Sequence, residues 1–577
     1  MPTLEWIGKD KVINHHQQVP YRVLEAKYTY NAEKSDNMII RGDNLEALKA
    51  LLPKYEGRIK CIYIDPPYNT GNEGWVYNDN VNDPKIKKWL GEVVGKEGED
   101  LSRHDKWLCM MYPRLKLLQR LLSVDGVIFI SIDDTEYANL KIICDEIFGS
   151  NCFVSNISWQ RTYSTRNDSK GIVNEVEHIL CYSKQPDWQP NKLPRTAEMD
   201  SKYKNPDNDI MPWTSSDAFA PGAATHQGMV YAIQHPFSGQ LIYPYAGSCW
   251  RYQQDSMLEI MNGWTEYELR DLDDAQKRAE VCGITADEVR PGIKAIMLAK
   301  ALPEAQKDAT AVLKRGQWPR FYFTSNGKGG IRRKTYLNNV EGTPPTNYWP
   351  HIETGHTDEA KKELISVFGG KSPFDTPKPA RLIERVLQIS SNLDSIILDS
   401  FAGSGTTAHA VLNMNKADGG NRKFILIEMM DYAESITAER VKRVVDGYGT
   451  GKQAVEGTDG DFTFYDLGQA LLLPDGNLNE EIDTAKIREY VWYMETKTPL
   501  AEAVSETPYY LGTNNNTGYY FFYEKDRITT LGYEFLATIK EKSESYLIYA
   551  DLCTIPDEEL KRFNITFKKI PRDIAKL

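Results

Sequence analysis

Short apolar runs that end in polar or glycine-rich segments recur along the chain. Residues 61–64 read Cys-Ile-Tyr-Ile, residues 396–398 read Ile-Ile-Leu and residues 424–427 read Phe-Ile-Leu-Ile. Each run predicts a buried strand that meets a loop. Strands of this kind are typical of an open α/β sheet. Such sheets bind ligands at the carboxyl ends of their strands.

The first of these runs is followed by Asp65-Pro66-Pro67-Tyr68. The amino group of a nucleobase is a poor nucleophile because its lone pair is delocalised into the ring. Accepting its hydrogens on the Asp65 carboxylate and the Pro66 carbonyl would favour a tetrahedral nitrogen, and Tyr68 offers a face for stacking. The four residues therefore suit methylation of an amino group. Taken alone, they also fit an ordinary turn after a strand.

The second run leads into Asp399 and then Phe401-Ala402-Gly403-Ser404-Gly405-Thr406-Thr407. Glycines at this position can cradle a phosphate, but the segment lacks the Gly-Lys-Ser/Thr ending of a nucleotide-phosphate loop. Glu428 ends the next strand, roughly 20 residues beyond the glycines, which is the arrangement that binds ribose hydroxyls. We therefore expect an adenosine-containing cofactor. A solvated glutamate at a strand end is the alternative.

The order of the two motifs, catalytic before cofactor-binding, resembles the β-class of S-adenosylmethionine-dependent DNA amino-methyltransferases. The chain is especially similar to the modification subunits of type III restriction systems. This resemblance implies an α/β fold with a doubly wound, Rossmann-like methyltransferase sheet that is permuted, in which residues 107–122 form a helix. It implies a catalytic loop formed by Asp65, Pro66, Pro67 and Tyr68. It also implies an S-adenosylmethionine site formed by Asp43, Lys378, Asp399, Phe401, Gly403, Gly405, Thr406 and Glu428. Ser400 departs from the family, which more often has proline there.

Two of these cofactor residues also have simpler interpretations. Asp43 precedes a predicted helix and would cap its amino terminus without contacting any ligand. Lys378 lies in a proline-rich turn, where a solvated lysine is common. The resemblance favours the cofactor pocket for both.

The resemblance also implies the reaction and the partners. Aspartate at the first motif position favours transfer to adenine N6, with cytosine-N4 methylation as the nearest alternative. A second alternative is a DNA-recognition subunit that directs a partner nuclease. A type III restriction (Res) subunit is a possible partner, since the chain itself lacks a helicase phosphate loop. The family also implies a homodimer.

The overall charge opposes a duplex DNA partner, because 69 basic and 81 acidic residues give a net charge of −12. Residues 313–336 differ, since they contain no acidic residue and their aromatic side chains and glycines alternate with basic ones. We expect this segment to contact double-stranded DNA, with a solvated basic loop as the alternative. Its basic residues are Lys314, Arg315, Arg320, Lys328, Arg332, Arg333 and Lys334.

The two motifs and the basic segment between them divide the chain into four parts. We expect a catalytic half over residues 1–188, a target-recognition domain over 189–345, a cofactor-binding half over 346–453 and a small C-terminal assembly domain over 456–577. Eight scattered cysteines without a Cys-x-x-Cys pair argue against a zinc site, so no metal is predicted. No apolar run is long enough to span a membrane and no secretory signal is evident, which fits a cytoplasmic protein.

Overall fold

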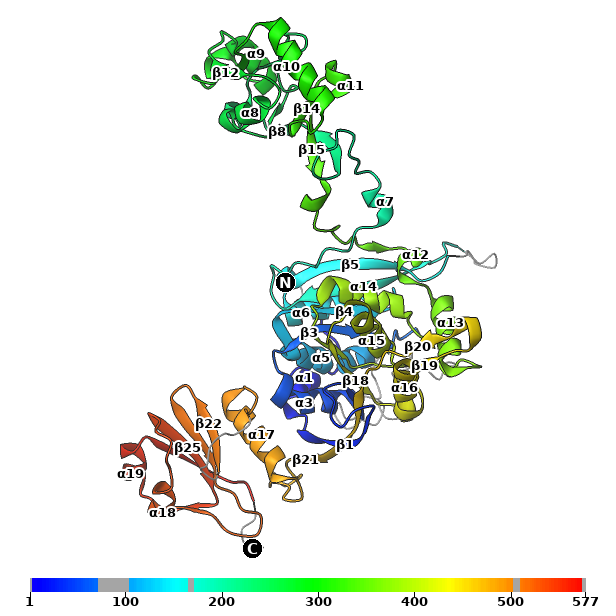
Figure 1. The fold of residues 1–577 in the computed structure, drawn as a ribbon. Coiled ribbons are helices and arrows are strands. Elements are labelled where there is room, and N and C mark those ends of the chain that lie inside the picture. The colour runs from blue at the N-terminus through cyan, green and yellow to red at the C-terminus, as the bar shows by residue number, and fades with distance from the viewer. Residues whose placement is uncertain (1–2, 71–102, 164–170, 502–508, 573–577) are drawn as a thin grey trace. The chain divides into compact units, whose positions relative to one another are not determined.

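The computed structural model describes residues 3–70, 103–163, 171–501 and 509–572, apart from the side chain of Asn339. The chain divides into two compact units. One comprises Lys192–Pro344, and the other comprises the segments on either side of it. Figure 1 shows the elements of both units along the chain. The two units are described separately below.

A large mixed sheet forms the centre of the first unit. In the described part of the chain it has ten strands. Their order is β1 (Arg22–Tyr30), β21 (Phe462–Ala470), β2 (Met38–Arg41), β18 (Lys423–Glu428), β17 (Ile396–Asp399), β3 (Ile59–Ile64), β4 (Leu122–Ile132), β6 (Val176–Ser183), β5 (Phe153–Gln160) and β16 (Tyr348–Trp349). The strands from β2 to β4 in this order are all parallel, and β6 is antiparallel to both of its neighbours.

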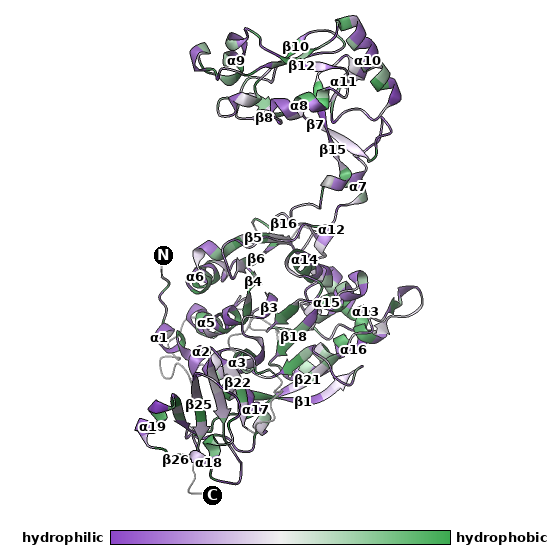
Figure 2. Ribbon diagram, turned by 60° about the vertical axis from the view of Figure 1, so that its left-hand side comes forward, coloured by the Kyte–Doolittle hydropathy of each residue, from purple (hydrophilic) through white to green (hydrophobic). Residues whose placement is uncertain are grey.

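Helices cover both faces of this sheet (Figure 2). The helices on one face are α3 (Asn44–Tyr55), α5 (Arg103–Leu121) and α6 (Tyr137–Phe148), and those on the other are α14 (Ala380–Ser390), α15 (Thr406–Asp418) and α16 (Glu439–Asp446). The apolar sides of α3, α5 and α6 pack on the sheet in one continuous core. This arrangement confirms the predicted doubly wound α/β fold.

Strands from distant parts of the sequence lie side by side at the centre of the sheet. Ile397 of β17 pairs with Cys61 of β3, and Leu398 pairs with Ile62. The two strands are parallel, so the loops that follow them leave the same edge. The fold thus brings the Asp-Pro-Pro-Tyr segment next to the glycine-rich segment, although about 330 residues separate them in the sequence.

The sheet extends further along the chain than the sequence indicated. Strand β21, Phe462–Ala470, inserts between β1 and β2 and pairs with both. The predicted start of the C-terminal domain at residue 456 is therefore wrong. The predicted boundary missed β21 because its partner strands, β1 and β2, lie more than 400 residues earlier in the chain. The part of the chain beyond the central sheet begins after β21.

That C-terminal part contains helix α17 (Thr484–Thr496) and a four-stranded sheet. The sheet consists of β22 (Tyr510–Asn514), β23 (Thr517–Phe521), β25 (Ser545–Ala550) and β27 (Ile565–Lys569). Two runs of apolar and aromatic residues in this region, 519–523 and 546–550, overlap β23 and β25. Across the described residues, no helix is both long and apolar enough to cross a bilayer.

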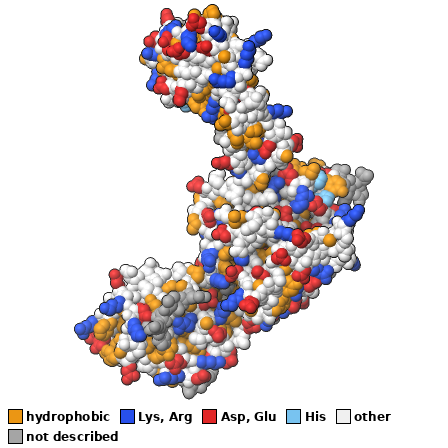
Figure 3. Space-filling model, in the orientation of Figure 1, with side chains coloured by type: hydrophobic (Ala, Val, Ile, Leu, Met, Phe, Trp, Pro, Cys, Tyr) orange, Lys and Arg blue, Asp and Glu red, His pale blue; other side chains and the backbone are white. Residues whose placement is uncertain are grey.

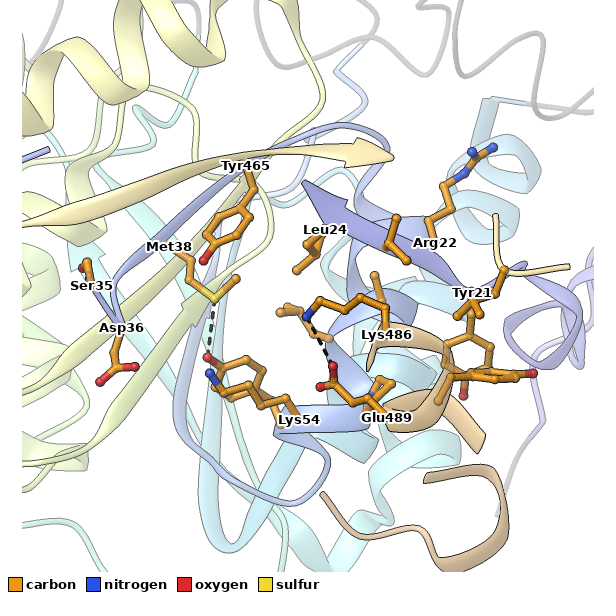
Figure 4. Close-up of a pocket in the computed structure, with 17 residues that line it drawn as sticks. Tyr21, Arg22, Leu24, Ser35, Asp36, Met38, Lys54, Tyr465, Lys486 and Glu489 are labelled. Atoms are coloured by element: carbon orange, nitrogen blue, oxygen red, sulfur yellow. Dashed lines mark hydrogen bonds and ion pairs between the residues drawn. The ribbon is translucent and has the colours of Figure 1, made fainter. Parts of the chain in front are cut away.

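The surface does not explain the function by itself, because acidic and basic side chains are interspersed on the face shown in Figure 3. A cavity of about 120 Å³ lies where β1, α3 and α17 meet (Figure 4). Within it, the Tyr55 hydroxyl donates to Met38 Sδ at 3.4 Å and Lys486 Nζ donates to Glu489 at 3.3 Å. These polar groups satisfy one another, so we assign the cavity no ligand.

The Lys192–Pro344 unit is built on an aromatic core. Its sheets include β14 (Phe321–Phe323), β15 (Ile331–Tyr336) and β7 (Trp213–Asp217), and helix α10 (Leu302–Arg315) packs in the same cluster. Phe321 and Phe323 are fully buried, so these aromatic residues support the fold and do not interleave with basic residues on the surface.

The prediction that Lys334 contacts DNA is wrong. Its side chain is completely buried, and its ammonium lies 2.5 Å from both Asp207 and Asp209. The side chain of Lys334 faces the interior of the unit, where two carboxylates neutralise it. Lys334 therefore supports the unit internally and does not contact DNA.

Candidate active site

Four acidic side chains meet at one edge of the central sheet. Asp65 follows β3, Asp399 ends β17 and Glu428 ends β18, and the three strands run in parallel. Glu177 reaches the same edge because it begins the antiparallel strand β6. The carboxyl edge of a doubly wound sheet is where such folds bind ligands.

Lys378 joins the catalytic motif in a compact group of charges. Its ammonium donates to both carboxylate oxygens of Asp65 and to the Tyr68 hydroxyl, each at 2.8 Å. The Tyr68 hydroxyl lies 2.7 Å from Asp65 Oδ1. Burial lowers the pKa of Lys378, but the charges of Asp65 and Glu177 outweigh it and raise that pKa. Lys378 is therefore a fixed cation beside Asp65.

Glu177 completes this group and was not assigned a role from the sequence. Its carboxylate lies 3.2 Å from Lys378 Nζ and 3.7 Å from the Arg161 guanidinium, and it accepts a hydrogen bond from Tyr68. Only 4% of its side chain is exposed. Burial and the nearby carboxylates raise the pKa of Tyr68 well above its ordinary value, so the phenol stays protonated. The only sequence signal for Glu177 is an acidic residue at the start of an apolar strand.

The catalytic loop is held from outside the motif. The Trp107 indole on α5 donates to the Pro67 carbonyl at 2.7 Å. Asn69 adopts a left-handed backbone conformation, with φ of 60°, and its amide donates to the Arg103 carbonyl at 3.1 Å. Together with the fixed φ of Pro66 and Pro67, these contacts leave the loop little freedom. A preformed loop favours accurate placement of a reacting group.

The glycine-rich loop after β17 needs its glycines. Gly403 and Gly405 have φ of 51° and 80°, in the left-handed region. A Cβ atom on Gly405 would lie 3.0 Å from the Thr437 carbonyl oxygen, and one on Gly403 would lie 3.3 Å from the Phe374 ring. The Thr437 hydroxyl also donates to the Gly403 carbonyl at 2.6 Å. The loop is therefore tightly clamped on one side.

Glu428 and Asp399 are buried carboxylates at the base of this loop. Glu428 accepts hydrogen bonds from the Gly403 and Met430 amides at 2.8 and 3.0 Å. Asp399 accepts from the Phe401 amide at 3.0 Å and from the Thr407 hydroxyl at 2.6 Å. Burial raises the pKa of each carboxyl to about 7. Both groups can therefore respond to a ligand or a change in pH near neutrality.

Arg440 is a second residue that the sequence analysis missed. It is completely buried and donates to Ser404 Oγ at 2.9 Å and Thr406 Oγ at 2.8 Å. Thr406 in turn donates to the Lys378 carbonyl at 3.2 Å, which ties the glycine-rich loop to the charged group around Asp65. No local motif marks an arginine that acts from a helix far along the chain.

Asp43 performs the capping role that was its alternative interpretation. Its carboxylate accepts from the Leu45 and Glu46 amides at 2.9 and 3.1 Å at the start of α3, and lies 3.4 Å from Arg114. The next residue, Asn44, donates to the Ser400 carbonyl at 3.3 Å. Asp43 thus lies beside the glycine-rich loop. A cofactor contact is compatible with this cap, because a carboxylate can accept further hydrogen bonds.

The basic residues predicted to bind DNA differ in their solvent exposure and in their contacts within the protein. Lys314, Arg315 and Lys328 are exposed. Arg332 pairs with Asp217 at 2.8 Å. Arg320 and Arg333 are partly buried, Arg320 over the Tyr252 ring and Arg333 against Ser216. Three of the seven residues therefore remain fully exposed to a partner.

Comparisons with known proteins identify the family of the chain. The DNA methylase family matches residues 59–439. The type III restriction-modification enzyme StyLTI Mod subunit of Salmonella typhimurium is 32% identical over 448 residues, which are 73% of this chain and 57% of that protein. The EcoPI Mod subunit of Escherichia phage P1 is 29% identical over 462 residues, or 74% of this chain and 63% of that protein. The chain thus spans less than two thirds of the length of these relatives.

A structural comparison adds no further support. The solved PvuII DNA methyltransferase, a cytosine-N4-specific enzyme, is 13% identical with a TM-score of 0.32 and covers 73% of this chain and 91% of its own. A similarity this low supports no statement about the chemistry. The sequence match extends from β3 to the first residue of α16 and includes both motifs of the candidate site. The chain therefore belongs to the DNA methylase family.

Proposed function

We propose that the chain is a DNA methyltransferase that transfers a methyl group from S-adenosylmethionine to N6 of adenine. The observation that carries this proposal is the direct pairing of β3 with β17, which sets Asp65 beside the loop that contains Gly403 and Gly405. One loop supplies acceptors for an amino group and the other supplies a site for an adenosine-containing cofactor.

The residues at the glycine-rich loop fit this cofactor. Gly403 and Gly405 allow the left-handed turn of the loop, and Glu428 provides a carboxylate suited to ribose hydroxyls. The buried Ser400 Oγ has no hydrogen-bond partner within the described chain, so it is available to a ligand. Phe401, Asp43 and Thr406 would complete the pocket. When bound here, S-adenosylmethionine supplies an electrophilic methyl group.

The residues around Asp65 would hold and activate the base. Asp65 and the Pro66 carbonyl accept the two hydrogens of the amino group, and the Tyr68 ring stacks on the flipped base. Lys378 already occupies both Asp65 oxygens, but a carboxylate has about four acceptor sites, so the amino group can share them. Glu177 balances the charge of Lys378 while Asp65 engages the base. Positive charge that develops on the amino nitrogen is stabilised by Asp65.

The relatives suggest the biological setting. Those named above are Mod subunits of type III restriction-modification enzymes. By this likeness, the Lys192–Pro344 unit would recognise the DNA target with Lys314, Arg315 and Lys328, and the C-terminal part would serve in assembly. A homodimer that pairs with a Res subunit in the cytoplasm follows from the same reasoning. Recovery of a large ATPase with the tagged protein from its host would support the partner, and its absence would favour a methyltransferase that acts alone.

Two other functions are alternatives to adenine-N6 methylation. Cytosine-N4 methylation would use the same residues, and Asp65 favours adenine only as a tendency of the family. A recognition subunit that directs a nuclease would bind DNA without needing the Asp65 group. Mass spectrometry of nucleosides from cells that gain the gene separates these functions. N6-methyladenine is the expected product, N4-methylcytosine would replace the adenine assignment, and no new methylated base would favour recognition alone.

A further inference from the structure

Three nearly parallel aromatic rings form a stack outside the site described above. The Tyr163 ring lies 5.2 Å from the His351 ring and 4.8 Å from the His356 ring, with angles of 25° and 27° between their planes. The two imidazoles are 5.8 Å apart and 22° from parallel. Tyr163 is 57% exposed, so one aromatic residue of the stack is open to solvent.

The two histidines are held in place by the framework. His351 Nδ1 lies 2.8 Å from the Gln160 side-chain oxygen. His356 Nδ1 accepts a hydrogen bond from the Glu359 amide at 3.1 Å and so caps helix α13 (Thr357–Phe368). Because the supporting rings are fixed, Tyr163 is preorganised in a flat arrangement and need not be ordered by a ligand.

The stack lies on the same edge of the sheet as the candidate active site. Gln160 ends β5, and its neighbour Arg161 lies 3.7 Å from Glu177, which contacts Tyr68. In the sheet, β5 is three positions from β3. Neighbouring strands are about 4.8 Å apart, so the stack lies on the order of 15 Å from Asp65. That distance corresponds to a few nucleotides of DNA.

The surroundings of the stack suit a nucleobase. Tyr348 and Ile352, which are 52% and 73% exposed, add apolar surface next to the two histidines. The Arg161 guanidinium is 40% exposed and provides a positive charge between the stack and the active site. Figure 3 shows histidine atoms beside hydrophobic side chains on this face. Aromatic side chains of this kind bind bases through their π faces without requiring a particular base.

We propose that Tyr163, supported by His351 and His356, is a stacking platform for an unpaired base that neighbours the target base in the DNA. The proposal rests on the proposed DNA methyltransferase function. Extrusion of a target base disturbs its neighbours in the strand, and a platform on the same sheet edge holds one of them. It thereby adds affinity for the distorted DNA and leaves the cofactor site unchanged.

The test compares variants of the full-length protein on a duplex that contains a mapped methylation site. Tyr163→Ala removes the ring, Tyr163→Leu keeps apolar volume and Tyr163→Phe keeps the ring. The matched control is Tyr533→Ala, which removes a tyrosine of similar exposure, 54%, in the C-terminal part. The measurements are the Kd for DNA, the KM for DNA, the Kd for S-adenosylmethionine and the fluorescence of 2-aminopurine placed at each position beside the target.

We expect Tyr163→Ala and Tyr163→Leu to weaken DNA binding about tenfold, the usual effect of losing one stacked base. Tyr163→Phe and Tyr533→Ala should bind DNA as the unaltered protein does, and all four variants should bind S-adenosylmethionine equally. One flanking 2-aminopurine should be quenched only when residue 163 is aromatic. Unchanged DNA affinity in Tyr163→Ala, or equal loss in Tyr163→Phe, would overturn the platform. If the unaltered protein neither methylates nor binds DNA, the proposed function fails instead.

Discussion

Glu177 gives the most specific prediction about the chemistry of the site. The Glu177→Gln substitution removes one negative charge and keeps the size of the side chain and an oxygen that accepts hydrogen bonds. Glu177 lies 3.2 Å from Lys378 and 3.7 Å from Arg161. The change removes the counter-charge that these two cations share and leaves Lys378 paired with Asp65 alone. The variant site thus carries one more unit of positive charge than the original site.

The size of the effect follows from the distance between charges. A sulfonium that can deliver a methyl group to an amino group on Asp65 lies about 10 Å from Glu177, given a near-attack separation of roughly 3 Å. One pair of unit charges at this distance interacts by about 1–2 kcal/mol at an effective dielectric constant of about 20. S-adenosylmethionine carries this charge and S-adenosylhomocysteine does not. The preference for the charged ligand should therefore fall about tenfold.

Isothermal titration calorimetry with both ligands on the DNA-free protein measures this preference. Glu146→Gln is the matched control, because Glu146 also accepts from a lysine and a tyrosine, Lys9 at 3.1 Å and Tyr112 at 2.7 Å. We expect this control to keep the original ratio of affinities. If Glu177→Gln also keeps that ratio, Glu177 does not set the charge of the site.

Other substitutions test other parts of the structure. Lys334→Met should destabilise the Lys192–Pro344 unit by about 3–5 kcal/mol in denaturant unfolding, because two buried carboxylates lose their cation. Lys328 is exposed, so Lys328→Met should change stability by less than about 0.5 kcal/mol but reduce the salt dependence of DNA binding. If Lys328→Met destabilises the unit and Lys334→Met alters only DNA binding, the roles assigned to both lysines are wrong. Gly405→Ala should weaken S-adenosylmethionine binding in calorimetry, because φ is 80° and the new methyl group would lie 3.0 Å from a carbonyl oxygen; unchanged affinity would contradict this. Burial raises the pKa of Glu428 from 4.5 to about 7. Between these pH values the folded protein keeps a proton that the unfolded chain has released. The ligand-free protein should therefore lose stability as the pH rises through this interval. Glu428→Gln should reduce this dependence in unfolding experiments at pH 5 and 8 and leave the part due to Asp399, whose pKa is also raised to about 7. An unchanged dependence would contradict the role of Glu428.

The sequence predicted the central fold because its strands are strongly patterned. The runs that became β3, β17 and β18 are buried on both faces. Strands β17 and β18 end at residues of the candidate site, and β3 ends directly before Asp65. The family resemblance implied a permuted sheet, but the pairing of β3 with β17 was not predicted, because no local pattern specifies it. Strand β21 was misassigned because its partners, β1 and β2, lie more than 400 residues earlier in the chain.

The side chains that complete the site were harder to predict. Glu177 and Arg440 act through contacts across the fold, and neither lies in a motif whose spacing identifies it. Lys334 shows the opposite problem. It lies in a basic segment and was therefore predicted to contact DNA, but its side chain is buried. Charge counts along the sequence do not distinguish inward from outward positions unless the register of the strand is known.

The most direct test of the whole account is nucleoside mass spectrometry of unmethylated DNA incubated with S-adenosylmethionine and the purified protein or its Asp65→Ala variant. The variant should still bind S-adenosylmethionine in calorimetry, which shows that the cofactor site remains folded. We expect N6-methyladenine with the unaltered protein and none with Asp65→Ala. An equal yield of N6-methyladenine from both proteins would contradict the role of Asp65, and no methylated base from either protein on varied DNA would contradict the proposed activity.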